Sequence, residues 1–357
     1  MNGVFARLHQ QMSSSAPRPL RLKLLLLLLL PPSWCYALIL QLRNLAYDRK
    51  LLSSYPSSLP IISVGNIAVG GTGKTPTVDW LIKGFVGQGK KAAIISRGYG
   101  GSYREAVAVV SDGCQIKMTA DRCGDEPLLL ARRNPGCPVV VARRRTEGVR
   151  YVEDHFDVDV IVLDDAFQHR RLARDFDLVL LDAKDPFGNA WTLPGGKLRE
   201  SKSALKRADA LLLTRSTDQT DLSIFDLPTF RSRHCLSLQV KGLDGTVCGL
   251  EDLKNKKIYA FAGLADNLRF FESLSRVGVV PSMTRSLPDH VAYNPEILEL
   301  IAAGAGGCDL LLTTEKDAVK LSDDMFELPC YYVSLHLEID DGEELMQLIS
   351  RRLWRQE

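Results

Sequence analysis

The hydrophobic positions of this chain fall into short continuous runs separated by longer stretches of mixed polarity. From about residue 59 onward, runs rich in Val, Ile and Leu alternate with helix-length segments such as 76–88 and 126–133. Continuous apolar runs are typical of strands buried on both faces of a parallel sheet, with helices as the connections. The first set of predicted strands covers residues 61–64, 92–96, 139–142, 158–163, 178–181 and 210–213.

The same alternation resumes after a more polar stretch near residues 240–257. We therefore predict an α/β protein with two domains. The larger, over 57–240, has a mostly parallel sheet with helices on both faces, and the smaller α/β domain covers 241–357. Ligands of such sheets bind beyond the carboxyl ends of the strands, so functional residues are expected directly after the apolar runs. The second set of predicted strands covers 258–261, 279–281, 310–313 and 331–334.

The first 47 residues contain no Asp or Glu, and they include a leucine run over 24–30 that ends at Pro31 and Pro32. As a helix this run would rise only ~10 Å, against a hydrocarbon core of ~30 Å, and we expect the prolines to break it. A composition with Arg and Ser but no acids is typical of a transit peptide. We predict a targeting leader over 1–32 with a mitochondrial address; a secretory signal is the competing interpretation.

Residues 33–56 show an amphipathic helical pattern, with Trp34 and Tyr36 near the start and Arg43, Arg49 and Lys50 among the later turns. Such a helix can lie at a bilayer surface, with its apolar face at the acyl boundary and its cations near anionic headgroups. The alternative is an ordinary helix packed on the globular body.

Composition excludes several classes of protein. The chain has 357 residues, 45% of them hydrophobic and 25% charged, which is typical of a globular protein of two ordinary domains. A net charge of +2 does not indicate a nucleic-acid binder. The eight cysteines form no C-x-x-C pair, and we expect reduced thiols without zinc or a disulfide framework. No obligate protein partner is evident.

The most specific chemical signal is a glycine-rich turn between the predicted strand 61–64 and the helix that follows. Its backbone N–H groups can converge on phosphates, Lys74 can reach the β- and γ-phosphates, and the Thr75 hydroxyl can bind Mg²⁺. The usual phosphate-loop pattern begins with glycine where this chain has Ala68. A glycine-rich turn with a chance Gly-Lys-Thr is the alternative. The predicted ATP-binding residues are Ala68, Val69, Gly70, Gly71, Thr72, Gly73, Lys74 and Thr75.

Asp164 and Asp165 end another predicted strand and can supply the second half of a Mg²⁺ site, although a solvated turn would show the same pattern. Gln168 and His169 follow closely enough to contact the nucleotide or its metal.

Asp125, at the start of a predicted helix, can serve as a base for a substrate hydroxyl or merely complement the helix dipole. His290 lies in a predicted loop of the second domain, where an isolated histidine is more often structural.

Together these segments resemble the tetraacyldisaccharide 4′-kinase (lipid A 4′-kinase) family. The resemblance covers roughly residue 33 to the C-terminus, and its motifs occur in the family's order. They are Ser63–Asn66 with Val69–Pro76, Ser96–Gly100, Gly124–Pro127, Asp164–Arg171, Leu193–Gly196 with Leu198–Glu200, Pro288–His290 and Thr314–Ala318. Ala166 and Val291 depart from the usual glycine and second histidine, and residues 1–32 have no counterpart in the bacterial pattern.

The resemblance implies a membrane-associated, two-domain kinase with a P-loop NTPase-like fold and its active site in the cleft between domains. It would transfer the γ-phosphoryl group of ATP to the 4′-hydroxyl of tetraacyldisaccharide 1-phosphate, giving lipid IVA. Asp125 and His290 would form the catalytic dyad, and domain closure would complete the site. The implied metal ligands are Thr75, Asp164, Asp165 and Glu200, and the implied phosphate or substrate contacts are Arg145, Arg171, Gln168 and His169.

Two alternatives remain open at this stage. A membrane-associated ATPase switch acting on a protein partner would also use a doubled glycine, but the lysine expected before Gly70 is Val69. A kinase of another sugar or lipid hydroxyl would keep the same phosphate-binding residues and differ in its acceptor pocket.

Overall fold

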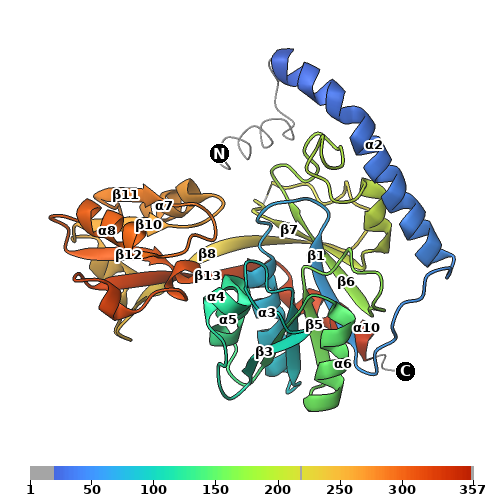
Figure 1. Cartoon of the computed structure of the whole chain (residues 1–357), viewed down its shortest axis with the longest axis horizontal. Helices are drawn as coiled ribbons and strands as arrows, with labels where there is room; N and C mark the ends of the chain where they lie inside the picture. The colour runs from blue at the N-terminus through green and yellow to red at the C-terminus, as the bar shows by residue number, and fades with distance from the viewer. Residues whose placement is uncertain (1–19, 218, 355–357) are drawn as a thin grey trace. The chain divides into compact units, whose positions relative to one another are not determined.

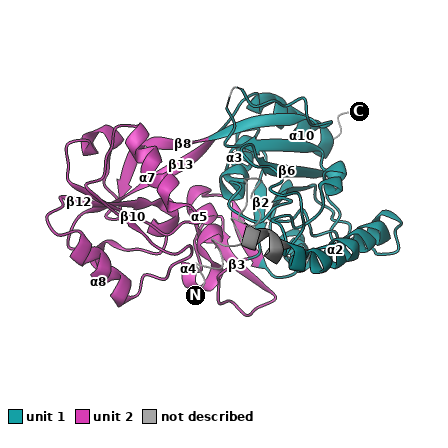
Figure 2. Ribbon diagram, turned by 90° about the horizontal axis from the view of Figure 1, so that it is seen from above, with its two compact units in different colours: residues 1–97, 142–233, 338–357 teal, residues 98–141, 234–337 magenta. Residues whose placement is uncertain are grey.

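The structure is a computed structural model that describes residues 20–217 and 219–354. The chain divides into two compact units, coloured separately in Figure 2. Unit 1 comprises the chain up to Arg97, Ala142–Arg233 and the chain from Glu338 onward. Unit 2 comprises Gly98–Val141 and His234–Leu337. Each unit is therefore assembled from separate segments of the sequence.

This division differs from the predicted contiguous domains 57–240 and 241–357. The predicted boundary at 240 lies close to the crossing at Arg233, but residues 98–141 group with unit 2 and the C-terminal helix groups with unit 1. The alternation of strands and helices continues unchanged through residues 98–141, so hydrophobic patterning gives no sign that the chain leaves unit 1 and returns.

Unit 1 contains a parallel sheet in the order β2, β5, β1, β6, β7. Every residue of the central strand β1 is buried, and its register places Val64 opposite Asp164 of β5. The carboxyl ends of these two strands therefore meet at one edge of the sheet, as Figure 1 allows the reader to follow. The strands are β1 (Ile61–Asn66), β2 (Ala92–Ser96), β5 (Val160–Asp164), β6 (Phe176–Asp182) and β7 (Ala210–Thr214).

Three helices of unit 1 pack on this sheet. α3 (Lys74–Gly87) contacts β1 and β5, α6 (Arg145–His155) contacts β2, and α10 (Gly342–Leu353) contacts β6. The T-shaped pair of Phe85 and Trp354, with ring centroids 5.7 Å apart, joins α3 to the end of the chain. This contact and the packing of α10 on β6 both lie within unit 1. A short 3₁₀-helix, η1 (Lys202–Arg207), precedes β7.

Unit 2 contains a second sheet, parallel from β11 through β10 and β12 to β13, and followed by β8 and the antiparallel β9. The predicted strand 279–281 is not formed, and its place in the sheet is taken by β11 a few residues later. The strands are β8 (Thr229–Gly242), β9 (Val247–Gly249), β10 (Ile258–Ala262), β11 (Met283–Ser286), β12 (Leu310–Thr314) and β13 (Cys330–Ile339).

The helices and the inserted segment complete unit 2. α7 contacts β10 and β11, and α5 packs on α9, where an ion pair joins Arg133 to Glu315. The helices are α7 (Asn267–Arg276), α8 (Pro295–Gly304), α9 (Glu315–Ala318), η2 (Leu250–Leu253) and η3 (Asp323–Met325). Residues 98–141 contribute β3 (Val107–Asp112), α4 (Ala120–Cys123), α5 (Asp125–Arg133) and most of β4 (Pro138–Ala142).

The N-terminal helix corrects one prediction. α2 (Leu20–Asp48) continues through Pro31 and Pro32, which were expected to end it, and Figure 1 shows one continuous blue helix. Proline removes a helical N–H but keeps a helical φ, so tertiary contacts can retain the helix. Here the contacts converge on Ser33, which is 2% exposed. Its carbonyl accepts from Thr192 Oγ1 at 2.9 Å, and its Oγ accepts from Gly195 N at 2.8 Å.

A second contact holds the later part of α2. Glu200, only 1% exposed, accepts hydrogen bonds from Arg43 Nη2 at 3.1 Å and Asn44 Nδ2 at 3.0 Å, and Arg207 Nη2 donates to it at 2.9 Å. The outer side of α2 carries exposed apolar side chains, among them Leu28 and Trp34. In the part of the chain that the structure describes, no helix is long and apolar enough to cross a bilayer.

Gly65 allows β1 to approach the turn after β5 closely. A Cβ built at this position would lie 2.6 Å from Phe167 Cβ, which is closer than carbon atoms approach one another. We expect Gly65→Ala to lower the free energy of unfolding by about 1–3 kcal/mol, measured by chemical denaturation. The control is Gly87→Ala in α3, where the added methyl meets nothing within 4 Å and stability should not fall. Equal stabilities of the two variants would contradict this account.

Candidate functional site

The glycine-rich loop joins β1 to α3 in the way that the sequence predicts. Gly73 adopts a left-handed φ of 82° at the N-cap of α3, and Lys74 begins the helix. The first turn contains no acidic side chain, so its backbone N–H groups and the positive end of the helix dipole can bind an anion. The geometry of this loop suits a phosphate group.

The loop is held in place by neighbours outside it. Val69 N donates to Lys197 O at 2.8 Å, and Ala68 forms a bridge with Leu198. Asn66 Nδ2 donates to Thr72 Oγ1 at 2.9 Å, and Arg215 Nη2 donates to Gly71 O at 2.7 Å. Ala68, which replaces the usual first glycine, is buried and serves as part of this small β-bridge.

Asp165 lies beside Lys74, the lysine of the glycine-rich loop. Lys74 Nζ is 3.7 Å from Asp165 Oδ1, and Arg199 Nη1 donates to both carboxylate oxygens at 2.9 Å. Burial acts to raise the pKa of Asp165, but the positive charges of Lys74 and Arg199 outweigh it and hold the pKa below its ordinary value. Asp165 is therefore ionised near neutral pH and faces the loop as a negative charge.

Asp164, the last residue of β5, is 3% exposed and accepts a hydrogen bond from Ser96 Oγ at 3.0 Å. Carboxylate and hydroxyl oxygens are the ligands that Mg²⁺ prefers, so Thr75, Asp164 and Asp165 fit such an ion in their chemistry. Register and ion pairing place the acid pair beside the loop, as the sequence predicts.

Arg145 does not fit its predicted role as a phosphate contact. Its side chain is 1% exposed, and it donates to Ala142 O at 2.9 Å and to Asp164 O at 2.8 Å. A guanidinium used in this way braces the ends of two strands and is not accessible to a substrate. Its charge still acts at a distance, because it helps to lower the pKa of Asp165.

Glu200 likewise differs from the expectation of a metal ligand. Both of its carboxylate oxygens accept hydrogen bonds from α2 or from Arg207, and the side chain is almost completely buried. These contacts support a structural role in holding α2, and we do not carry Glu200 into the proposed metal site.

The remaining predicted contacts are spread along the turn after the acid pair. Gln168 Nε2 donates to Asn66 O at 2.8 Å, which ties this turn to the end of β1. Burial, followed by the positive charges of Arg145 and Arg97, lowers the pKa of His169 to about 4, so this imidazole is neutral at pH 7. Arg171 is exposed, and its backbone carbonyl accepts from Tyr55 N at 2.7 Å. These contacts are made within the protein, so the predicted substrate contacts of Gln168, His169 and Arg171 stay predictions.

The predicted dyad forms within unit 2. Asp125 is the first residue of α5 and is 7% exposed, and His290 lies in the loop after β11 with a positive φ of 56°. His290 Nδ1 lies 3.2 Å from Asp125 Oδ2. The sequence assigned the two residues to different domains. That expectation is wrong, because residues 98–141 belong to unit 2 and the contact is already made there.

The charges around the dyad favour an ion pair. The hydrogen bond to Asp125 raises the pKa of His290, against the opposing effects of burial and Lys316. Burial acts to raise the pKa of Asp125, but the hydrogen bond from His290 and the charge of Lys320 lower it below its ordinary value. Lys320 Nζ lies 3.2 Å from Asp125 Oδ2, and Lys316 Nζ lies 3.0 Å from Asp289 Oδ1 and 3.5 Å from His290 Nε2.

Several of these cations were not predicted as site residues. Arg199 and Lys316 lie inside quoted motifs, so those motifs were the signal that could have found them. Arg215 and Lys320 lie outside every motif and reach the site only through the fold.

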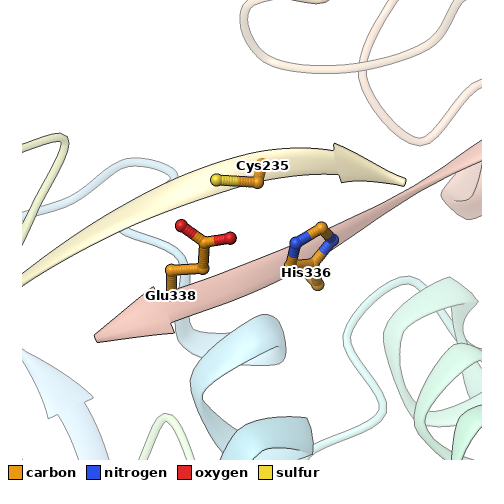
Figure 3. Close-up of side chains that lie close together, drawn as sticks. All are labelled: Cys235, His336 and Glu338. Atoms are coloured by element: carbon orange, nitrogen blue, oxygen red, sulfur yellow. The ribbon is translucent and has the colours of Figure 1, made fainter. Parts of the chain in front are cut away.

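Figure 3 shows a separate group of side chains, Cys235 on β8 with His336 and Glu338 on β13. Their possible metal-ligating atoms all lie within 4.8 Å of one another, but two of the three residues are exposed. Glu338 is also an ion-pair neighbour of Arg233, with Nε and Oε2 3.9 Å apart. The group takes no part in the phosphate loop or the dyad, and we assign it no metal.

A parallel sheet with a glycine-rich turn before a helix, and an acid at the end of the adjacent strand, defines a P-loop nucleotide-binding protein. The sequence model of the tetraacyldisaccharide-1-P 4′-kinase family matches residues 25–354. The chain belongs to this family.

Individual relatives agree with that assignment. The tetraacyldisaccharide 4′-kinase of Syntrophotalea carbinolica is 42% identical over 328 residues and covers 92% of each chain. That of Geobacter sulfurreducens is 39% identical, covering 93% of this chain and 94% of the relative. A crystal structure of the "apo" form of LpxK from Aquifex aeolicus in complex with ATP matches with a TM-score of 0.80 and 33% identity. It covers 92% of this chain and 100% of the solved one.

The raised pKa of His290 can be measured directly by NMR titration of the imidazole. We expect a value above the ordinary ~6.5, and a lower value in Asp125→Asn, which replaces the carboxylate by a neutral amide. The ion pair should stabilise the fold fully below pH ~6.5, and this contribution should be lost as the pH rises through the raised pKa. His169, with a pKa of about 4, serves as an internal control. An unchanged His290 pKa in Asp125→Asn would contradict the pairing.

Proposed function

We propose that this enzyme transfers the γ-phosphoryl group of ATP to the 4′-hydroxyl of a tetraacyldisaccharide 1-phosphate, a step of lipid A biosynthesis that gives lipid IVA. Family membership and the relatives' shared name support the acceptor, and the loop before α3 supports the donor. The single observation that carries the proposal is the contact between Asp125 and His290, a pair that can serve as a base in a chain that also has a glycine-rich loop suited to phosphate.

The reaction forms a bond between the hydroxyl oxygen and the γ-phosphorus while the bond from that phosphorus to the bridging oxygen of ADP breaks. The hydroxyl proton passes to the Asp125–His290 pair, which is held together before substrate binds. The N-terminal N–H groups of α3 and Lys74 bind the phosphates. Mg²⁺, for which Thr75, Asp164 and Asp165 are the proposed ligands, would neutralise charge on the phosphates. Asp165 also keeps Lys74 oriented toward the loop.

The ATPase switch proposed as an alternative is not supported by the comparisons, since the matched family and the relatives described above are kinases of a lipid disaccharide. The third possibility, another hydroxyl acceptor, differs only in the acceptor and is distinguished by the assay below.

We expect purified protein with ATP and Mg²⁺ to transfer labelled phosphate to the tetraacyldisaccharide. Asp125→Asn and His290→Ala should each lower kcat by about 10²–10⁴-fold, because each removes half of the base, with little change in the KM for ATP. Asp324→Asn, an exposed acid of unit 2, is the control and should keep full activity. Hydrolysis of ATP without labelled lipid in the wild-type reaction would refute the acceptor assignment, and full activity of either dyad variant would refute the role of the dyad.

We also propose that α2 lies on the membrane that holds the substrate. Four acyl chains anchor such a lipid in the bilayer, at ~0.8 kcal/mol for each buried CH₂, so the enzyme must reach the surface. α2 offers exposed apolar side chains from Leu27 to Leu45, which no other described residue covers. The largest exposures on its later turns are those of Trp34 at 68%, Ile39 at 64% and Leu42 at 56%.

We expect Ile39→Asp with Leu42→Asp to abolish co-sedimentation with anionic vesicles, because both side chains are exposed and would carry the apolar contact. Unfolding should be unchanged, since neither residue is buried. Leu268→Asp, at a leucine of α7 that is 69% exposed, is the matched control and should leave vesicle binding intact. Equal vesicle binding by the Ile39→Asp, Leu42→Asp double variant and the Leu268→Asp control would argue against a membrane role of α2.

Residues 1–32 are proposed to be a leader with a mitochondrial address. The support is their composition, which lacks acids and contains Arg and Ser. Residues 1–19 lie outside the described chain, and the structure begins the helix α2 at Leu20, inside the predicted leader.

A further inference from the structure

Lys320 occupies an unusual position for a lysine. It lies two residues beyond the end of α9, and its side chain is only 10% exposed. Its ammonium group contacts Asp125 Oδ2 at 3.2 Å, the carbonyl of Val291 at 3.1 Å and Asp317 Oδ1 at 3.5 Å. All four residues belong to unit 2. A buried lysine with this set of partners is fixed in place and cannot reach a distant ligand.

We propose that Lys320 is a positioning residue that fixes the Asp125 carboxylate against His290 and keeps it ionised for proton transfer. This inference rests on the proposed function of the dyad and names a residue that acts through it. Lys320 touches neither substrate nor nucleotide in this account. Its partners are the dyad acid and the backbone beside the dyad histidine.

The Lys320 ammonium group has a second acidic neighbour, Asp317. Asp317 is 0% exposed, and its Oδ2 accepts from Thr314 Oγ1 at 2.7 Å and from Gly263 N at 2.9 Å. The other oxygen of Asp317 faces Lys320. The Tyr293 ring also lies under the ammonium, with Nζ 5.2 Å from the ring centroid. Because Lys320 is held by these neighbours, its contact limits the movement of the Asp125 carboxylate.

The contact between Lys320 and Val291 does not depend on the side chain of residue 291. Val291 stands where a second histidine is common, but the bond that Lys320 donates goes to the backbone carbonyl. This carbonyl is present whatever the side chain is. Lys320 thus ties down the residue directly after His290 and limits movement of the loop that carries it.

Both His290 and Lys320 contact the same oxygen of Asp125, Oδ2. Two donors on one oxygen orient the carboxylate plane and leave Oδ1 as the oxygen for a substrate hydroxyl. The other charged groups near the dyad are Lys316, Asp289 and Glu126, and the buried Cys123 thiol is neutral because burial raises its pKa to about 12. Among these groups, Lys320 is the cation that contacts Asp125 directly.

The test is the pH dependence of kcat/KM in Lys320→Met and Lys320→Arg. An opposite charge within ~4–6 Å lowers a carboxyl pKa by ~1–3 units. The acid limb of the profile, the low-pH range in which kcat/KM falls, should therefore move to higher pH by about one unit or more in Lys320→Met. At a pH within this acid limb, kcat/KM of Lys320→Met should be lower than that of the wild-type protein by about tenfold or more. Lys320→Arg keeps the charge and should return the limb close to its original pH. Lys256→Met, at an exposed lysine of unit 2, is the matched control.

Lys320→Met also leaves Asp317 without its cation, and the variant can fail to fold for that reason. Combining it with Asp317→Asn removes the second buried charge and should preserve the fold while keeping the shifted limb. An acid limb at the wild-type pH in a folded Lys320→Met protein would overturn the proposal, and a drop in thermal stability alone would mark a structural role.

A substrate-free measurement separates this proposal from the proposed function. Removal of a cation beside the dyad should raise the pKa of His290 in an NMR titration, while Lys320→Arg should leave it near the wild-type value. An unchanged His290 pKa in Lys320→Met would overturn the positioning role. Failure of the wild-type protein to phosphorylate the disaccharide, together with the expected NMR shift, would overturn only the acceptor assignment.

Discussion

The contact between Asp125 and His290 joins residues that are 165 positions apart in the chain, and the proposed chemistry of unit 2 depends on it. It requires residues 98–141 to pack with the C-terminal segment, and the packing of α5 on α9 achieves this. The ion pair of Arg133 with Glu315, largely shielded from water, fixes the other end of the same helix. α5 is thus held at both ends, and its first residue is presented to the histidine loop with little freedom.

The two functional elements use charge in similar ways. In unit 1 an acid, Asp165, is held between Lys74 and Arg199, and in unit 2 Asp125 is held between His290 and Lys320. In both cases burial opposes ionisation and nearby cations overcome it. A carboxylate that stays ionised while shielded from water interacts more strongly with a nearby cation or proton than an exposed carboxylate does.

The sequence predicts best what local chemistry determines. The loop from Ala68 to Thr75, the helix that follows it and the acid pair after β5 depend on neighbours in sequence, and the structure places them as expected. Val/Ile/Leu runs predict most strands for the same reason. The differences between expectation and structure concern tertiary contacts. Ser33 is hydrogen-bonded to Gly195 directly after the two prolines of α2, and Arg145 donates to the backbone at the end of β5. Glu200 accepts a hydrogen bond from Arg43 of α2. No spacing in the sequence reveals which distant group a charged side chain will meet.

Unit 2 is made from two segments of the chain separated by part of unit 1, and this limits how the protein can be dissected. A fragment that starts near residue 240 would lack α5, β3 and the dyad acid, and it would expose the surface of α9 that α5 covers. An isolated unit 2 would need Gly98–Val141 joined to His234–Leu337 by an engineered connection. Recombination between relatives faces the same restriction. A single crossover between residues 125 and 290 would combine Asp125 from one parent with the His290 loop from another.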